Sequence, residues 1–206
     1  MENDRSTMHR MDDPIRTETQ RKLLAATERL IYAGGITATG MDRIVKESGV
    51  ARKTIYRYYK DKDELVADAL AKRDIRWMNW FITTSGKADT PAGRLLATFD
   101  ALEQWFFTPD FRGCAFINAA GEIGDPGDPI RAVAKLHKVK LRDYLRQLAE
   151  EYGAEDPDEL AAEFLILIDG AITVALVMEK KEAAREAQKL ARKLLAMRPP
   201  QSGKPA

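Results

Sequence analysis

Thr39–Lys62 reads TGMDRIVKESGVARKTIYRYYKDK, and this stretch decides the fold. Met41, Ile44 and Val45 recur at the spacing of one face of a short helix. Gly49 follows in a turn, where glycine adopts a positive φ without steric cost, and a second helical pattern comes directly after it. Two short helices joined by a turn that contains glycine form a helix-turn-helix unit, whose second helix enters the DNA major groove. We therefore predict a DNA-binding unit here.

The charge distribution supports this prediction. The net charge of the 206 residues is only +1, which by itself says nothing about nucleic acid. Residues 1–62, however, hold 13 Lys/Arg against 9 Asp/Glu, whereas the remainder holds 20 against 23. Residues 51–62 alone carry five basic residues and one acid. The positive charge thus concentrates on the segment that we expect to contact DNA.

Composition also bounds the cellular setting. The single cysteine, Cys114, excludes an intramolecular disulfide framework and suits a reducing compartment. No basic-then-apolar leader is present at the N-terminus. The most apolar run, Phe164–Met178, is too short to span a bilayer and is interrupted by Asp169 and Gly170. We expect a cytoplasmic protein that does not associate with a membrane.

Helical patterns extend through the rest of the chain, and no alternating apolar and polar run indicates a strand. We predict an all-α fold of about nine helices. A helix over 16–33 precedes the two short helices, and a long connector follows from Asp61 to about Thr83. Three later helices begin at a capping residue followed by proline, at Thr90-Pro91, Asp128-Pro129 and Asp156-Pro157; a short helix lies within 114–123, and the last covers 182–197. The expected domains are an arm over 1–15, a DNA-binding head over 16–62, a ligand-binding and dimerisation body over 63–198, and a tail over 199–206.

The order of these elements resembles the tetracycline-repressor (TetR) family of transcriptional regulators. The residues that carry the resemblance are Ala25 and Ala26 through Gly35, Ile44, Gly49-Val50, Thr54, Tyr56, Tyr58-Tyr59, Lys62 and Leu65. A departure is Gly40, which stands where a Thr or Ser commonly caps the second helix of the family. The segment 112–118 followed by Glu122 is similar to a motif of one branch of the family. The resemblance implies a repressor that a small molecule releases from its operator.

Residues of the head are candidates for DNA contact. Arg52 or Lys53 can pair with guanine O6 and N7, because both stand at the start of the second short helix. By the resemblance, Tyr56 and Lys62 match positions that contact phosphate. The predicted DNA-binding residues are Thr39, Arg52, Lys53, Thr54, Tyr56, Tyr58, Lys60 and Lys62. A solvated basic helix face is the alternative interpretation, and Ile55 and Tyr59 are expected to pack inward. The basic residues of the arm, among them Arg5 and Arg10, could also reach DNA.

The body carries many aromatic residues, with a few polar residues set among apolar stripes. Ligand pockets are apolar cavities with a few convergent polar groups, so these residues are candidates for ligand contact. The predicted ligand-binding residues are Trp77, Trp80, Phe81, Phe106, Phe116, Asn118, Glu122, His137, Tyr144 and Asp169. Ordinary core packing, with satisfied buried hydrogen bonds, is the commoner role of such residues. Cys114 is either a small buried hydrophobe or a sensing thiol.

The last two helices offer more apolar surface than one protomer can readily cover. The family resemblance implies a homodimer through a four-helix bundle formed by these two helices of each subunit. The predicted interface residues are Phe164, Ile168, Ile172, Leu176, Ala187, Leu190 and Leu194. The alternative is that both helices only close the core of their own protomer.

An enzyme finds little support in the sequence. His9 and His137 are the only histidines, and no glycine-rich phosphate-binding loop is present, so neither a metal site nor a cofactor is expected. A helical small-molecule-binding or adaptor protein without DNA binding remains the alternative to a regulator. The partners that we expect are double-stranded operator DNA, a second copy of the chain and a small-molecule inducer whose identity the sequence does not give.

Overall fold

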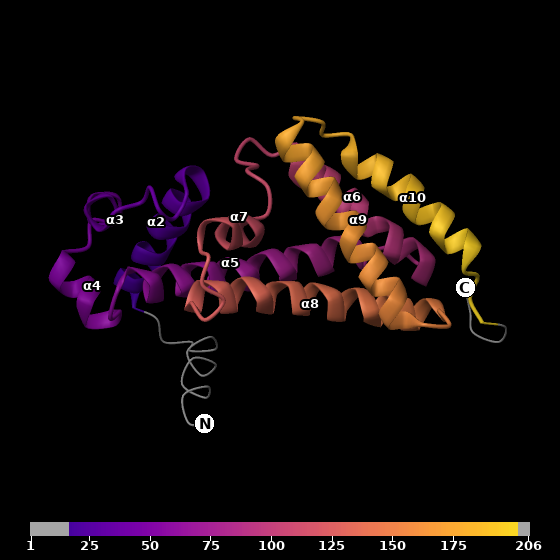
Figure 1. Cartoon of the computed structure of the whole chain (residues 1–206), viewed down its shortest axis with the longest axis horizontal. Helices are drawn as coiled ribbons and strands as arrows, with labels where there is room; N and C mark the ends of the chain where they lie inside the picture. The colour runs from indigo at the N-terminus through magenta and orange to yellow at the C-terminus, as the bar shows by residue number, and fades with distance from the viewer. Residues whose placement is uncertain (1–16, 202–206) are drawn as a thin grey trace, which may run out of the picture. The chain divides into compact units, whose positions relative to one another are not determined.

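The structure, a computed structural model, describes residues 17–201, which form nine α-helices and no strand (Figure 1). The all-α prediction is confirmed for this part of the chain. The helices are α2 (Glu18–Gly34), α3 (Met41–Ser48), α4 (Arg52–Tyr58), α5 (Lys62–Ser85), α6 (Pro91–Phe106), α7 (Ala115–Glu122), α8 (Pro129–Tyr152), α9 (Pro157–Val177) and α10 (Ala183–Met197). The arm predicted for residues 1–15 and most of the predicted tail lie outside the described residues.

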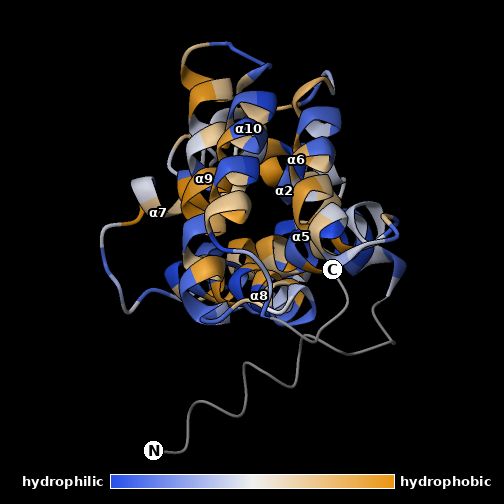
Figure 2. Cartoon of the chain, turned by 90° about the vertical axis from the view of Figure 1, so that its right-hand side faces the viewer, coloured by the Kyte–Doolittle hydropathy of each residue, from blue (hydrophilic) through white to orange (hydrophobic). Residues whose placement is uncertain are grey.

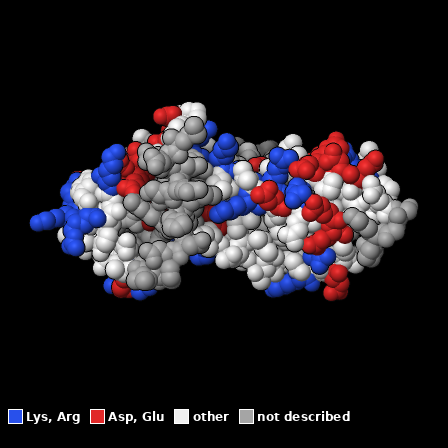
Figure 3. Space-filling model, turned by 90° about the horizontal axis from the view of Figure 1, so that it is seen from below, with Lys and Arg blue, Asp and Glu red and all other residues white. Residues whose placement is uncertain are grey.

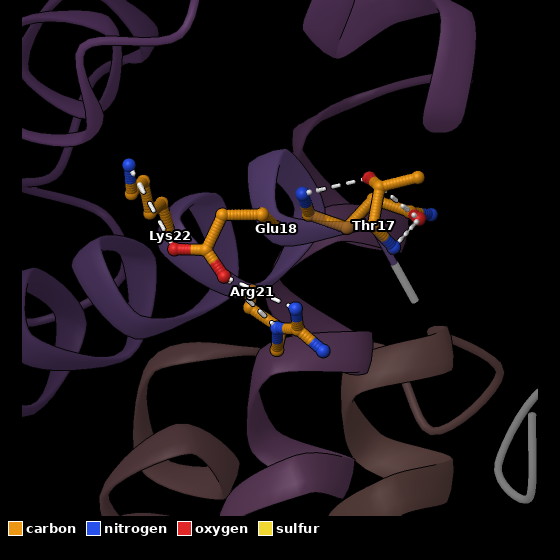
Figure 4. A network of polar contacts seen from close by, with 5 residues as sticks. Thr17, Glu18, Arg21 and Lys22 are labelled. Carbon is orange, nitrogen blue, oxygen red and sulfur yellow. Dashed lines mark hydrogen bonds and ion pairs between the residues drawn. The ribbon is translucent and has the colours of Figure 1, made fainter. Parts of the chain in front are cut away.

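Helix α2 begins at a capping box. The Thr17 side chain accepts a hydrogen bond from the backbone N–H of Gln20, and the Gln20 side chain accepts one from the backbone N–H of Thr17. Glu18, in the first turn, forms exposed ion pairs with Arg21 and Lys22 (Figure 4). The capping box satisfies amide groups that the start of a helix leaves without partners, whereas the ion pairs of Glu18 lie on the surface.

Side-chain caps start the later helices where the sequence predicts them. Thr90 and Asp156 accept hydrogen bonds from backbone N–H groups of the first turns of α6 and α9, each followed by proline. Asp128 caps α8 in a similar way, at 2.7 Å from the amide nitrogen of Ile130. Asp61 caps α5, as expected, and accepts from the amide of Glu64 at 2.9 Å. Asp or Thr before an N-terminal proline thus fixes three of the helix starts.

The chain divides into two compact units. One contains residues 17–76 and 115–135, and the other contains residues 77–114 and 136–201. This division differs from the head and body expected from the sequence, because α7 and the start of α8 group with the helix-turn-helix and not with the body. Helix α5 passes from one unit to the other without a break in its helical structure, between Arg76 and Trp77.

The core of the first unit is built from the inner faces of α2 to α5. Its buried members are Leu23, Leu24, Leu30, Ile44, Val50, Ile55, Tyr59, Leu65 and Ala69. A buried carboxylate joins α2 to α5, since Glu28 binds Arg73 at 2.9 Å and Arg76 at 2.5 Å. Arg73 also lies over the ring of Tyr32, 3.7 Å from its centroid. The apolar core packs the short helices α3 and α4 against α2 and α5, and the ion-pair cluster joins α2 to α5.

In the second unit, α6, α9 and α10 pack on one another around a core that includes Phe99 and Phe164. Figure 2 shows hydrophobic residues along α9, whereas α10 carries hydrophilic residues as well. Helix α9 starts at Pro157 and is therefore longer than the apolar run seen in the sequence. Among the described residues it is the one helix long and apolar enough, by length and composition, to cross a membrane. A core helix of a soluble protein meets the same test.

Candidate nucleic-acid interface and ligand site

The helix-turn-helix turn has the backbone geometry that its glycine predicts. Gly49 ends α3 in the left-handed region, with φ of 67°, and its N–H donates to the carbonyl oxygen of Val45 at 3.0 Å. The Ser48 hydroxyl accepts a hydrogen bond from the amide of Val50 at 3.2 Å. A side chain at position 49 would meet no neighbouring atom, so the backbone conformation alone favours glycine there.

Helix α4 has one buried face and one exposed basic face. Ile55 and Tyr59 are buried in the core of the first unit, as predicted, and the Tyr59 hydroxyl donates to Asp68 at 2.7 Å. The exposed residues of the predicted DNA-binding set are Arg52, Lys53, Tyr56 and Lys60. Lys and Arg side chains project from the end of this unit that carries α3 and α4 (Figure 3). With 48% of its surface exposed, Tyr56 can offer its hydroxyl to DNA.

Arg52 pairs with Asp42 of α3 across the turn. The carboxylate of Asp42 is almost fully exposed, and the Arg52 side chain is about half exposed, so the pair lies on the surface. An exposed pair of this kind is weak, and a phosphate or a guanine edge can replace the carboxylate.

Two predicted DNA-binding residues instead serve the turn between α2 and α3. Thr39 is fully buried, and its hydroxyl donates to the carbonyl oxygen of Gly35 at 2.7 Å. The Nζ atom of Lys62 donates to the carbonyl oxygens of Ile36 and Thr39, at 3.0 and 3.3 Å. Neither group points freely to solvent. The sequence did not reveal this, because the acceptors are backbone carbonyl groups.

Glu122, predicted to bind ligand, lies at the same turn. Its two carboxylate oxygens accept hydrogen bonds from the backbone N–H groups of Ile36, at 3.0 Å, and Thr37, at 2.8 Å. Burial raises the pKa of Glu122, but the bonds from Thr37 and Ile36 and the nearby charge of Lys62 outweigh burial and leave that pKa below its usual value. Phe116 and Asn118 also belong to α7, so three of the ten predicted ligand-binding residues lie in the first unit.

The other seven lie in the second unit, where aromatic rings converge on Trp77. Its indole stacks on Phe81 with centroids 4.7 Å apart, and it meets the edges of His137 and Trp105 at 5.2 and 5.6 Å. Trp80 lies 6.0 Å from Trp77. The indole Nε1 of Trp77 is buried without an acceptor in the structure. Buried N–H groups usually find an acceptor, so this donor is suited to a polar ligand atom.

Two polar residues that were predicted to bind ligand, Tyr144 and Asp169, each have a partner within the second unit. The Tyr144 hydroxyl lies 2.7 Å from the Ser85 hydroxyl, which in turn donates to the carbonyl oxygen of Phe81 at 2.7 Å. Burial raises the pKa of Tyr144, against the opposing effect of its hydrogen bond with Ser85. Asp169 forms an ion pair with Lys138 at 2.5 Å, which connects α9 to α8.

The predicted dimer residues fall into two groups. Phe164, Ile168, Ile172 and Ala187 are buried inside the protomer, so they offer no surface to a partner. Leu176 and Leu194 are half-buried, and Leu190 is exposed. The exposed stripe of α9 runs instead through Ile166, Gly170, Thr173 and Val177. Because α9 is apolar almost all round, its sequence could not show which face is covered by its own protomer.

A left-handed glycine between two short helices, followed by an exposed basic face on the second, defines a helix-turn-helix DNA-binding protein. Residues 23–69 match the family model "Bacterial regulatory proteins, tetR family", and residues 91–191 match "Tetracyclin repressor-like, C-terminal domain". The chain belongs to the TetR family of transcriptional regulators, which confirms the resemblance seen in the sequence.

Relatives support this assignment over most of the chain. The HTH-type transcriptional regulator YjdC of Escherichia coli (strain K12) is 24% identical over 176 residues, which cover 84% of this chain and 91% of that protein. The uncharacterized HTH-type transcriptional regulator YxaF of Bacillus subtilis (strain 168) is 25% identical over 170 residues, which cover 81% of this chain and 89% of that protein. SCO4454, a TetR-family transcriptional regulator from Streptomyces coelicolor, aligns structurally with a TM-score of 0.81 at 27% identity, covering 87% of this chain and 95% of that one.

Proposed function

We propose that this regulator is a repressor that a small molecule releases from its operator. The observation that carries the proposal is the exposed basic face of α4, the helix that follows the left-handed turn at Gly49. Lys53 and Lys60 supply charge for phosphates, and Arg52 stands at the N-terminal end of the helix, where base edges are read. A protein with these properties acts where DNA is, in the cytoplasm. We infer no catalytic activity of its own, in line with its relatives, which are transcriptional regulators.

The active form is a homodimer, and exposed apolar residues at the end of the chain support this proposal. Ile166 and Val177 on α9 are 70% and 72% exposed, and Leu190 and Met197 lie on one face of α10. Gly170, between Ile166 and Val177, has open space around it, which lets another helix approach closely. Two recognition helices related by a two-fold axis fit successive major grooves roughly 34–36 Å apart.

The aromatic cluster around Trp77 is the proposed ligand site. Trp77, Trp80 and Phe81 all belong to α5, and the same helix supplies Lys62 and Leu65 to the first unit. A ligand that displaces rings of this cluster therefore acts on a helix whose other end belongs to the DNA-binding unit. It favours release only by the difference between its affinities for the two states of the protein.

A DNA-binding measurement tests the proposal. Fluorescence anisotropy with duplexes from the intergenic regions that flank the gene should show tight, salt-sensitive binding to one of them and weak binding to a scrambled duplex. Arg52→Ala should weaken the specific complex more than the scrambled one. Equal binding of the wild-type protein to all duplexes, or no binding, would contradict the proposal.

The ligand part needs its own measurement. A thermal-shift screen against a library of apolar and aromatic metabolites should identify compounds that stabilise the wild-type protein, and the same compounds should release the labelled duplex. Trp77→Phe should reduce the thermal shift while leaving DNA affinity unchanged. If stabilising compounds leave the DNA complex intact, the protein is a ligand-binding DNA protein but not an inducible repressor.

A further inference from the structure

The turn between α2 and α3 is held on two sides by charged groups from other helices. Glu122 of α7 accepts hydrogen bonds from the N–H groups of Ile36 and Thr37, one on each carboxylate oxygen. Lys62 of α5 donates to the carbonyl oxygens of Ile36 and Thr39. Two backbone donors and two backbone acceptors of this short turn are therefore bound by side chains of opposite charge. All of these residues lie in the first unit.

The local sequence makes room for Glu122. Gly35 has φ of +89°, and a Cβ atom there would lie 3.1 Å from both carboxylate oxygens. A larger residue would be strained by its backbone and would also press on the carboxylate. Thr39 completes the arrangement from inside, since its buried hydroxyl donates to the carbonyl oxygen of Gly35.

This turn leads directly into the DNA-reading helices. Gly40, at the N-terminus of α3, offers no side-chain cap, so the first turn of α3 gains no anchor from its own cap residue. The direction in which α3 leaves the turn also sets the place of α4, because the two helices are joined by three residues only. Contacts that fix residues 35–39 thus bear on the orientation of the recognition helix.

We propose that Glu122 is a positioning residue for operator binding: through the amides of Ile36 and Thr37, helix α7 sets the orientation in which α3 and α4 meet DNA. The proposal rests on the DNA-binding function proposed above. Glu122 touches no DNA in this assignment and acts through the turn. Glu122 lies more than sixty residues beyond α4 in the chain, so operator binding would depend on a residue far from the proposed recognition helix.

If Glu122 acted only through its negative charge, its neutral variants would bind DNA more tightly, which is the opposite of what a positioning role predicts. Removal of a negative charge close to the DNA-binding face reduces repulsion from phosphates, so a purely electrostatic role predicts tighter binding for a neutral variant. A positioning role predicts weaker binding to the specific duplex, with an unchanged dependence on salt, because no phosphate contact is lost. The sign of the change separates the two roles.

The test uses the full-length protein and a duplex enriched by the wild-type protein from a random-sequence library. Glu122→Ala should weaken binding to this duplex by about three- to tenfold, the size of one or two partly exposed charge-assisted hydrogen bonds. Glu122→Gln should fall between the wild type and Glu122→Ala, because its amide oxygen can still accept one bond. Glu150→Gln, which removes an exposed ion pair with Arg146 in the second unit, is the matched control and should leave affinity unchanged.

Amide NMR of the same variants supplies a readout that a general loss of stability would not give. The N–H signals of Ile36 and Thr37 should shift and exchange faster in both Glu122 variants and remain as in the wild type in Glu150→Gln. If Glu122→Ala does not fold, Glu122→Gln carries the test alone. Unchanged or tighter binding, or weaker binding without a change at Ile36 and Thr37, overturns the proposal. If the wild-type protein enriches no duplex, the DNA-binding function fails first and this proposal fails with it.

Discussion

The Nζ atom of Lys62 lies 3.0 Å from the carbonyl oxygen of Ile36, 26 residues earlier in the chain. The ammonium group of the lysine that begins α5 therefore binds backbone carbonyl oxygens of the turn before α3. Lys60, two residues earlier, is exposed, with its backbone N–H bound by Glu64 at 2.7 Å. Two lysines of one basic segment thus have different surroundings, and we expect only Lys60 to be available to DNA.

This difference can be measured with Lys62→Met and Lys60→Met. Lys60→Met should weaken binding to all duplexes alike and lower the slope of log Kobs against log salt by about 1, because one phosphate contact is lost. Lys62→Met should leave that slope unchanged and lower the melting temperature, because two carbonyl groups of the turn lose their donor. Anisotropy titrations at several salt concentrations, with calorimetry, measure both. Equal slopes for the two variants would contradict the assignment.

Asp42→Asn should tighten DNA binding. The carboxylate of Asp42 pairs with Arg52, and DNA has to displace it before the guanidinium can contact a base or phosphate. Loss of this exposed pair frees Arg52 and removes a negative charge, which should strengthen binding about two- to fivefold at low salt. The gain should shrink as salt rises. Asp110→Asn, in the second unit, is the control, and a weaker complex with Asp42→Asn would show that the pair orders Arg52 for DNA.

Ile166→Glu should convert the proposed dimer to monomer. Its side chain is exposed in the middle of α9, and a carboxylate there would be buried without a partner in an interface formed by α9 and α10. Light scattering after size-exclusion chromatography measures the mass, and circular dichroism should show unchanged helix content. Val139→Glu, on an exposed position of α8, should stay dimeric. If Ile166→Glu has the mass of the wild type, the interface lies elsewhere.

Tyr144→Phe should lower the free energy of unfolding by about 1 kcal/mol near pH 7, since a buried hydrogen bond to Ser85 is lost. The pKa of Tyr144 is raised above its ordinary value of 10.0, so the folded state holds the phenol proton more tightly than the unfolded state does. The stability that Tyr144 contributes to the folded state is therefore complete below about pH 10 and declines as pH rises through the raised pKa. Denaturant titrations of both proteins between pH 7 and 11 should show their difference shrinking at the alkaline end. A constant difference would show that the phenol does not titrate in this range.

Local signals in the sequence were sufficient to predict the helices. Proline after a capping Thr or Asp marks the starts of α6, α8 and α9, and Gly49 marks the helix-turn-helix. These features act within a few residues, so they can be seen in a single chain. The inward packing of Ile55 and Tyr59 follows from the period of one short helix in the same way.

The contacts of the site were harder to predict, because they join distant segments through backbone atoms. Glu122 accepts from amides 86 and 85 residues away, and a backbone N–H leaves no trace in the residue types. The covered face of α9 was hidden for another reason, since apolar residues surround the helix and periodicity cannot select one side. Ile166 and Ile168 look alike in sequence, yet one is exposed and the other is buried.

The grouping of α7 with the helix-turn-helix also concerns protein engineering. A chimera joined at the start of α5, near residue 62, would take α3 and α4 from one parent and the acceptor of the Ile36 and Thr37 amides from the other. The new regulatory part would then have to supply a carboxylate at the place of Glu122. If Glu122 positions this turn as proposed, we expect active chimeras only where the new part matches one acid to one turn, and grafts that carry residues 115–122 along with the head meet this requirement.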